Sequence, residues 1–572
     1  MEVLMSDSPL IDMSEITKLV SEMNVDRASP VPLSVQKASL LARRLLSRAS
    51  ELQTPQERRQ QHELERMMNS GSDKSTLIQM TDQAFRSERA ARSAEQLTHI
   101  LDVQGVPRFF STFDRAMLKG FQSFGAYLPG VSIPLVKDKM RAETANVVLP
   151  AEPELLQGHL AERRQHGVRM NVNYLGEALL GEQDAQRRLE SYLAALQLPE
   201  IEVISVKVST IYSQISSIAH HRAVQILSDR MELLYRAAAR ARFTRSDGIE
   251  VPKFVYLDME EYRDLSITVD TFIETLDRPG LEHVGAGIAL QAYVPDSAAV
   301  QKRITEWGRK RVAAGGAPVT IRIVKGANME MERVEASVEG WPQAPFMEKV
   351  DTDACYKLMI EYGLRPENAD AVKIGVASHN LFDLSYALVL TVERQVSAHV
   401  QFEMLEGMAN HQRRALSELA PNILLYAPAT RREDFVNAIG YLIRRLDENT
   451  GDDNFLRHTF KLEIGSEEWE SLERDFIECF DRIERLNLVP RRTQDRRSPP
   501  QEGGSLTRAE FVNEPDTDFA LPQNIEWAQG ILARWRGRHG ENAPRIPLYV
   551  AGQEVLGERD VRECLDPSRP GL

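Results

Sequence analysis

The feature that most constrains the fold is a series of eight short apolar runs, most of them rich in β-branched residues. They cover residues 168–176, 203–211, 254–260, 285–293, 320–327, 371–379, 400–406 and 423–429. Seven of them are separated from the next run by a segment long enough for a helix. β-branched residues favour strands, and strands that alternate with helices form parallel sheets. The series therefore predicts an α/β fold in which the strands close into a (β/α)8 barrel.

Each run carries a polar or ionisable side chain at or near its carboxyl end. These side chains are Glu177, Lys207, Asp258, Gln291, Arg322 with Lys325, His379, Glu403 and Tyr426. In a (β/α)8 barrel the active site lies at that face, because the loops there can vary while the barrel below them packs. We therefore expect these side chains to meet at one functional site.

The composition indicates a soluble globular protein that acts on something other than nucleic acid. A chain of 572 residues is too long for one core, so more than one domain is expected. Hydrophobic residues make up 42% and charged residues 27%, which is usual for soluble proteins. The net charge of -14 argues against nucleic acid as a partner, since phosphate binding needs a basic surface.

Several other classes of protein are excluded by missing patterns. The three cysteines, Cys355, Cys479 and Cys564, lie far apart without CxxC spacing, which excludes a disulfide scaffold or zinc ribbon and favours a reducing cytoplasm. No His or carboxylate pair has metal-site spacing, so we expect no metal. No GxGxxG follows a strand, no secretory signal begins the chain, and no apolar stretch approaches the ~20 residues of a membrane-spanning helix.

The patterns divide the chain into four parts. Residues 1–160 are predicted as a helical N-terminal arm region, and 161–460 as the barrel. A helical segment and a charged, Pro- and Gly-rich linker occupy 461–505, and 506–572 carry one predicted helix and one short strand. The long connection after the run at 320–327 contains GWPQAP, and we expect it to pass over the top of the barrel.

The last predicted barrel helix carries a compact polar cluster of Arg444, Arg445 and Glu448. Residues four apart are neighbours on a helix, and paired guanidiniums suit a carboxylate or phosphate. Barrels commonly bind anions after the eighth strand, which favours a binding role. The alternative is a solvated helix face with an Arg444–Glu448 ion pair.

Charged residues at the strand ends allow the same two interpretations. A lysine inside a barrel needs an anionic partner, so Lys207 either binds a ligand or pairs with Asp258 or Glu177 for structure. Arg322 and Lys325 are three residues apart, so we expect them on opposite faces of their strand.

His379 and Asn380 form a second polar pair, at the end of the run at 371–379. Either a ligand or the fold itself could be their hydrogen-bond partner.

An ordered set of short motifs resembles a known family. VKVS, LDMEE, IALQAY, IRIVKGA, VASHN, FEMLEGM, LLYAPA and YLIRRLDEN are similar to the FAD-dependent proline dehydrogenase domain of the bifunctional proline utilization A proteins. The similarity spans about residues 71–457. It implies oxidation of L-proline to Δ1-pyrroline-5-carboxylate, with a hydride moving from ring C5 to flavin N5 and electrons passing to a membrane quinone. It also implies a cytoplasmic protein that can contact the inner face of the membrane peripherally.

The resemblance assigns roles to residues of this sequence. For the substrate, Lys207, Arg444 and Arg445 would clamp the proline carboxylate, Leu405 and Tyr426 would pack on its ring, Asp258 would order the site and Glu177 would pair with Arg444 as a gate. For FAD, the matching positions are Gln291, Arg322, Val324, Lys325, Gly326, Ala327, Lys349, Thr352, His379, Asn380, Glu403, Leu405 and Glu448. Arg322 near flavin N5 would stabilise the reduced ring. The sequence departs from the family pattern at Asn328, Met329 and Met347, which leaves the flavin contacts at these positions open but not the substrate clamp.

The two ends of the chain also bear on the resemblance. The tail from FVNEPDTDF to LDPSRPGL resembles the first segment of the pyrroline-carboxylate dehydrogenase domain and ends before a cofactor fingerprint or catalytic cysteine. We therefore expect no NAD-dependent second activity from this chain. The ribbon-helix-helix DNA-binding module of some members is not recognised, in line with the absence of a nucleic-acid partner.

Two rival functions remain open. One is a flavin-free Schiff-base lyase on the same barrel, with Lys207 or Lys325 as the amine nucleophile. The other is a noncatalytic scaffold that binds protein partners through its acidic surface. Converging charges inside a barrel argue against the scaffold, since it would have no use for them.

Overall fold

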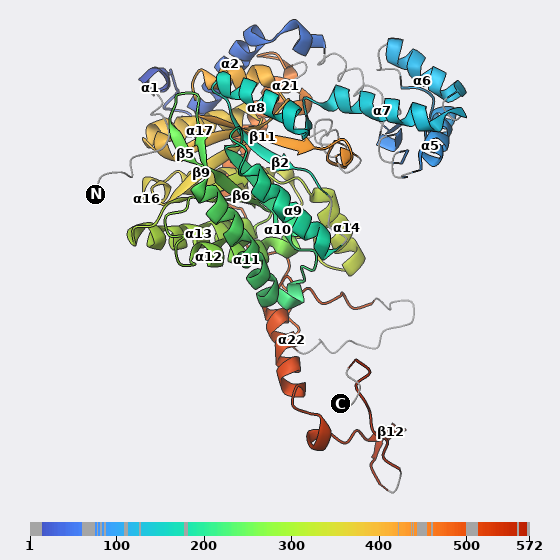
Figure 1. Cartoon of the computed structure of the whole chain (residues 1–572). Coiled ribbons are helices and arrows are strands. Elements are labelled where there is room, and N and C mark those ends of the chain that lie inside the picture. Colours follow the sequence, from blue (N-terminus) through green and yellow to red (C-terminus); the bar gives the residue numbers. More distant parts are fainter. Residues whose placement is uncertain are drawn as a thin grey trace.

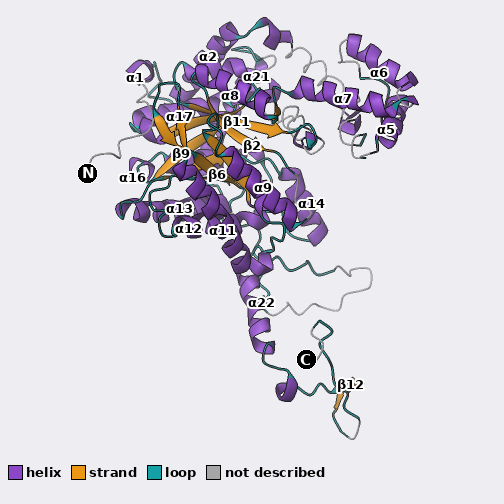
Figure 2. Ribbon diagram, viewed as in Figure 1, coloured by secondary structure: helices purple, strands orange, loops and turns teal. Residues whose placement is uncertain are grey.

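A closed parallel β-barrel forms the centre of the molecule (Figures 1 and 2). The computed structural model describes residues 14–59, 75–76, 78–80, 83–84, 87, 89–107, 112–124, 127–176, 181–420, 422–435, 438, 440–442, 455–458, 462–498, 513–557 and 560–568. The barrel strands are β2 (Arg169–Tyr174), β3 (Val203–Lys207), β6 (Phe254–Asp258), β7 (Gly287–Gln291), β8 (Val319–Val324), β9 (Val372–Ala377), β10 (Val400–Leu405) and β11 (Ile423–Thr430). Each pairs in parallel with the next, and β11 pairs with β2 to close the barrel. The predicted (β/α)8 barrel is confirmed.

The strand predicted over 203–211 is wrong in its second half. The chain leaves the sheet at Lys207 and forms the short helix α10 (Val208–Ile211). The Thr210 hydroxyl donates to the Lys207 carbonyl at 2.8 Å and lies 3.2 Å from the Tyr192 hydroxyl. The apolar residues of this half are buried as expected, but the apolar pattern of a short run cannot distinguish a strand from a buried helix.

Helices surround the barrel, as Figure 2 shows. They include α8 (Pro153–Gln165), α9 (Glu182–Ala195), α11 (His220–Arg240), α12 (Leu265–Leu276), α13 (Asp296–Ala313), α15 (Lys349–Gly363), α17 (Leu381–Glu393) and α18 (Asn410–Ser417). The long connection after β8 holds α14 (Met329–Glu339), a turn at 340–348 and then α15, with α16 (Pro366–Ala369) before β9. A small hairpin, β4 (Arg242–Thr244) and β5 (Glu250–Pro252), follows α11.

The N-terminal region is helical, as predicted, and has two parts. Helices α1 (Ser14–Ser21) and α2 (Leu33–Leu52) pack on the barrel, with the buried face of α2 against α17 and α18. Helices α5 (Ala90–Gln104), α6 (Thr112–Phe124) and α7 (Pro129–Thr144) enclose a separate small core and lie to one side of the barrel (Figure 1). Strand β1 (Leu149–Pro150) then joins the end of β11.

The C-terminal region begins against the barrel and then extends away from it. After α20 (Phe455–His458), α21 (Glu467–Ile483) packs on α15 and α17, where the rings of Phe382 and Phe476 stack at 5.3 Å. Helix α22 (Pro522–Trp535) projects from the body and leads to a hairpin of β12 (Leu548–Val550) and β13 (Gln553–Val555) (Figure 1). The single strand predicted in this tail is therefore two strands. The proposed domain boundaries stay a prediction.

Gly407 shows how tightly the end of β10 packs on the segment before β1. Its φ is +77°, and a Cβ there would lie 1.9 Å from the Asn146 carbonyl oxygen. We expect Gly407→Ala to lower the free energy of unfolding by about 2 kcal/mol or more, through backbone strain and steric clash. Urea unfolding followed by circular dichroism measures this change.

Gly158→Ala is the matched control, because Gly158 lies in α8 with open space around its Cβ position. It should raise the stability by about 0.5–1 kcal/mol, since alanine favours a helix. Equal effects of the two substitutions would contradict the packing described for Gly407.

Candidate active site

Arg322 occupies the centre of the barrel near the carboxyl ends of its strands. It projects from β8 and is 4% exposed. Its Nε donates to Glu403 Oε2 on β10 at 2.5 Å, and its Nη1 donates to Asp258 Oδ1 on β6 at 2.8 Å. The guanidinium also lies 3.9 Å from the ring centre of Tyr256 and 5.2 Å from that of Tyr426. Two carboxylates and two aromatic rings therefore fix one cation.

Further hydrogen bonds hold the two carboxylates. Asp258 accepts from the Tyr426 hydroxyl at 2.9 Å and from the Ser205 hydroxyl at 3.1 Å. Glu403 accepts from the Tyr256 hydroxyl at 2.9 Å and from the Gln401 amide at 2.8 Å. Within each strand these residues occupy alternate positions, so their side chains all point into the barrel.

A glycine on β9 leaves the room that Glu403 needs. A Cβ at Gly375 would lie 2.3 Å from Glu403 Oε1. The small residue on the neighbouring strand is therefore part of the site.

The polar column continues toward the amino ends of the strands. Arg169 donates to Gln401 at 3.1 Å and pairs with Glu202 at 2.9 Å, and Glu202 also accepts from Arg245 at 2.9 Å. The barrel interior is thus crossed by linked ions and amides from its mouth to its base. Such a column is costly to bury unless its charges are compensated, and each of these charged side chains has at least one partner of opposite charge.

The electrostatics of the column favour fixed protonation states. Burial lowers the pKa of Arg322, but the charges of Glu403 and Asp258 raise it above the ordinary value. Burial raises the pKa of Asp258 although Arg322 opposes that shift. We take the pair as ionic because arginine does not lose its proton in proteins. Burial also raises the pKa of Tyr256 and Tyr426, so both phenols remain hydrogen-bond donors.

Asp258, one of the two structural partners considered for Lys207, is not its partner in the structure. The two residues are register neighbours on β3 and β6, but Lys207 Nζ pairs with Glu260, which also accepts from the Ser209 hydroxyl. Arg322 holds Asp258 instead, so that carboxylate is already committed. Glu260 was missed by the sequence analysis, although its position two residues after Asp258 in LDMEE is a usable signal.

Lys325 belongs to a second ionic network just beyond the end of β8. Its Nζ lies 2.5 Å from Asp353 and 2.8 Å from Asp383. Lys349 pairs with Asp353 at 2.6 Å and Lys357 pairs with Asp383 at 2.6 Å. Burial lowers the pKa of Lys325, but the two aspartates raise it above the ordinary value, so the ammonium is retained. Lys325 and Lys349 were predicted from the sequence, whereas Asp353, Asp383 and Lys357 were not.

Arg322 and Lys325 point in different directions, but not because they alternate along one strand as predicted. Arg322 points into the barrel, whereas Lys325 follows the last residue of β8 and reaches α15 and α17. The strand ends at Val324, so strand alternation no longer applies to Lys325.

Other predicted residues line the same end of the barrel. Gln291 ends β7 and donates to the carbonyls of Met259 and Glu260 at 3.3 and 3.2 Å. His379 Nε2 accepts from the Leu405 backbone at 3.0 Å, which joins the ends of β9 and β10. Asn380 caps α17 by accepting from the Phe382 backbone at 2.9 Å.

The loop after β8 is shaped by a close contact. Gly326 has a φ of +142°, and a Cβ there would lie 2.5 Å from the Tyr293 ring. Ala327 follows it, and Asn328, one of the departures from the family, donates to the Glu260 carbonyl at 2.9 Å. Thr352 is buried on α15, and Met347 is 61% exposed. Because of its positive φ and the Tyr293 contact, position 326 suits only glycine.

Four predicted residues lie outside the described residues. They are Glu177, Arg444, Arg445 and Glu448. The roles of Arg444 and Arg445 in the clamp, of Glu177 in the gate and of Glu448 in FAD binding stay predictions.

Two buried polar atoms of the site fit a flavin. Arg322 Nη2 and Gln291 Oε1 are buried and have no hydrogen-bond partner within the described ranges. A buried donor and a buried acceptor without partners are costly, and a ring with acceptor and donor heteroatoms would satisfy both.

The part of the chain that the structure describes offers no group of His, Cys, Asp and Glu side chains for a metal ion. Within the same part, no helix combines the length and apolar character needed to cross a membrane.

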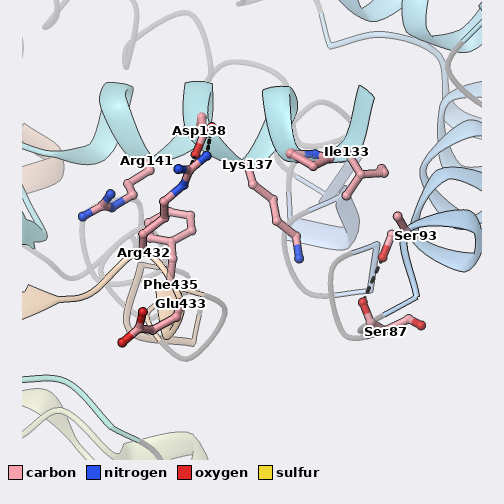
Figure 3. Close-up of a pocket in the computed structure, with 11 residues that line it drawn as sticks. Ser87, Ser93, Ile133, Lys137, Asp138, Arg141, Arg432, Glu433 and Phe435 are labelled. Carbon is pink, nitrogen blue, oxygen red and sulfur yellow. Dashed lines mark hydrogen bonds and ion pairs between the residues drawn. The ribbon is translucent and has the colours of Figure 1, made fainter. Parts of the chain in front are cut away.

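A pocket of about 220 Å³ lies away from these residues, between α5, α7 and the segment after β11 (Figure 3). Lys137, Asp138 and Arg141 line it from α7, with Arg432 and Phe435 opposite. Arg432 Nε donates to Asp138 at 2.9 Å, as the dashed lines in Figure 3 indicate. Among the predicted site residues that the structure describes, none lines this pocket, so it is distinct from the polar cluster inside the barrel.

Glu403→Gln tests the dependence of the barrel on its central ion pair. The substitution leaves Arg322 with a single carboxylate in a buried site, so we expect a loss of about 3 kcal/mol in the free energy of unfolding. Urea unfolding measures it. Glu22→Gln is the control, because Glu22 forms a 4.0 Å pair with Lys18 on the surface and should leave the unfolding midpoint unchanged. A similar midpoint for both variants would refute a structural role for the central pair.

Comparison with known proteins gives the chain a family. The proline dehydrogenase family model matches residues 156–458, more than half of the chain, whereas no curated protein matches. Proline utilization A from Corynebacterium freiburgense is 35% identical over 68% of this chain and 36% of its own, with a TM-score of 0.59. The enzyme of that name from Bdellovibrio bacteriovorus, inactivated by N-propargylglycine, is 23% identical over 92% of this chain and 50% of its own, with a TM-score of 0.68.

A variant of Bradyrhizobium japonicum proline utilization A is 17% identical over 92% of this chain and 53% of its own, with a TM-score of 0.60. The last two likenesses show the fold alone. This chain spans about a third to half of the length of these proteins. The family match covers the whole barrel and its strand-end residues, and the chain belongs to the proline dehydrogenase family.

Proposed function

We propose that this chain oxidises L-proline to Δ1-pyrroline-5-carboxylate at the mouth of the barrel, with FAD as its cofactor. The observation that carries the proposal is Arg322, a cation fixed by Asp258 and Glu403 whose Nη2 has no partner in the described part of the chain. Membership of the proline dehydrogenase family supports the same reaction. FAD, when bound, supplies a hydride acceptor at N5 for the hydrogen on proline C5.

The residues proposed to hold FAD are those that the family motifs match. They are Gln291, Arg322, Val324, Lys325, Gly326, Ala327, Lys349, Thr352, His379, Asn380, Glu403, Leu405 and Glu448. Arg322 carries a fixed positive charge in a site of low exposure, where it stabilises negative charge that develops during the reaction. Its two carboxylate partners keep it in place, so little reorganisation is needed.

The substrate is proposed to bind through its carboxylate. Lys207, Arg444 and Arg445 clamp it, Leu405 and Tyr426 pack on the ring, Asp258 orders the site, and Glu177 closes over the substrate by pairing with Arg444. The Tyr426 hydroxyl donates to Asp258, which holds the phenol ring in one orientation. Hydride transfer depends on the distance and angle between donor and acceptor, so the clamp works by orientation.

The electron acceptor is proposed to be a membrane quinone, reached from the cytoplasm through peripheral contact with the inner face of the membrane. This part of the proposal rests on the family resemblance of the motifs.

The Schiff-base lyase has weaker support. A lysine nucleophile must be a neutral amine. Asp353 and Asp383 raise the pKa of Lys325 against the effect of burial, and Lys207 is paired with Glu260. Lys325 is therefore placed to remain an ammonium group, and the Lys207 amine is held in an ion pair.

The absorption spectrum of the purified protein tests the proposal. We expect a flavin band that L-proline bleaches and D-proline does not, because a one-sided carboxylate clamp fixes which ring face meets the flavin. N-propargylglycine, which inactivates the Bdellovibrio protein, should likewise abolish bleaching by L-proline. Equal bleaching rates with the two enantiomers would rule out the clamp.

Lys207→Met tests the clamp within the described residues. Loss of one charge-assisted contact costs ~1.5–3 kcal/mol of binding free energy, so the KM for L-proline should rise roughly tenfold or more. Flavin content should stay within twofold of the wild type. Lys310→Met, on the outer helix α13, is the control and should leave both values unchanged. A normal KM for Lys207→Met would remove Lys207 from the substrate site.

A further inference from the structure

Arg492 is a buried cation far from the centre of the barrel. It follows α21, and its side chain is 1% exposed. The guanidinium lies 4.9 Å from the ring centre of Tyr262 and 4.8 Å from that of Trp341, and its Nε donates to the Pro342 carbonyl at 3.1 Å. An arginine so enclosed is held by the surrounding chain segments and is part of the packing between them.

Three carboxylates surround this guanidinium. Glu332 and Glu335 of α14 lie 3.8 and 3.6 Å from Nη2, and Asp518 lies 3.6 Å from Nη1. Glu332 and Asp518 are almost fully buried. A buried cation offsets the charge of such carboxylates, so its removal leaves them uncompensated.

Residues 491–492 and Asp516 lie against the end of α14 and the turn that follows it. The Asp516 backbone donates to the Glu339 carbonyl at 2.9 Å, and the Trp341 indole donates to the Asp516 carbonyl at 2.7 Å. Arg491 donates to the Pro345 carbonyl at 3.1 Å. Residues 491–492 and Asp516 therefore hold α14 and the turn that follows it by hydrogen bonds and packing.

Two connections lead from α14 to the barrel mouth. The helix begins at Met329, directly after the loop of Gly326 and Asn328. Glu332 also accepts from the Tyr262 backbone at 2.7 Å, and Tyr262 is two residues from Glu260. Glu260 in turn pairs with Lys207 and its carbonyl accepts from Asn328. A displacement of α14 would therefore reach both the loop after β8 and Lys207.

We propose that Arg492 is a positioning residue for the active site. Through it, residues 491–492 and 516–518 hold α14 and the loop at 260–262 in a fixed position at the barrel mouth. The proposal rests on the proposed function, since it concerns the same substrate lysine. It assigns a role in substrate binding to a segment outside the barrel.

The test uses Arg492→Gln and Arg492→Lys in the full chain. We expect Arg492→Gln to raise the KM for L-proline about fivefold or more while flavin content changes less than twofold, and Arg492→Lys to recover part of the loss through its charge. Arg497→Gln is the control, because Arg497 lies in the same segment but pairs only at the surface with Asp495 and Glu526. It should match the wild type.

Hydrogen exchange provides a readout that does not depend on activity. Arg492→Gln should increase amide exchange in residues 326–339 and 258–264 relative to the wild type and to Arg497→Gln, with exchange in α11 unchanged. A KM within twofold of the wild type in flavin-loaded Arg492→Gln, or unchanged exchange at 326–339 and 258–264, would overturn the positioning role. If wild-type protein is not bleached by L-proline, the proposed function fails, whereas the exchange result still decides whether Arg492 couples these segments.

Trp341→Phe serves if Arg492→Gln does not fold. It keeps the cation and an aromatic wall but removes the indole donor to Asp516. The same changes in KM and exchange, smaller in size, are expected. Wild-type values for both would overturn the proposal.

Discussion

One buried cation organises the barrel mouth. Arg322 lies on β8, and its two carboxylate partners lie on β6 and β10, each two strands away around the barrel. The three side chains can meet only inside a closed barrel. An unpaired charge at this depth would be costly, so the ion pairs tie opposite sides of the barrel together and restrict the guanidinium to one position.

The other charges at the mouth are arranged around this centre by the same rule. Lys325 is shared by two aspartates from α15 and α17, and Lys207 is held by Glu260 from the loop after β6. Each cation is thus anchored by an element other than its own strand.

The outer parts of the chain contribute to the site through α14. This helix starts at the loop after β8 and is gripped at its far end by the segment that contains Arg492. The position of α14 therefore depends on contacts at both of its ends. A helix in a loop of the barrel is in this way contacted by residues more than a hundred positions further along the chain.

The sequence by itself determined the strands of the barrel and several of the charged residues at their ends. Eight apolar runs, each with a polar end, predict the barrel and its functional face because strand preference and side-chain alternation are local properties. Lys207, Asp258, Arg322, Lys325 and Glu403 were found in this way. Local patterns also misled, since the apolar residues of 208–211 form a buried helix.

Tertiary structure alone decided which charges pair. Asp258 binds Arg322 although Lys207 is its register neighbour, and Lys207 binds Glu260. Asp353, Asp383 and Arg492 gained their roles only through contacts with distant segments. A charged residue is compatible with several partners in sequence, and only closure of the barrel and packing of the helices set the distances that select one.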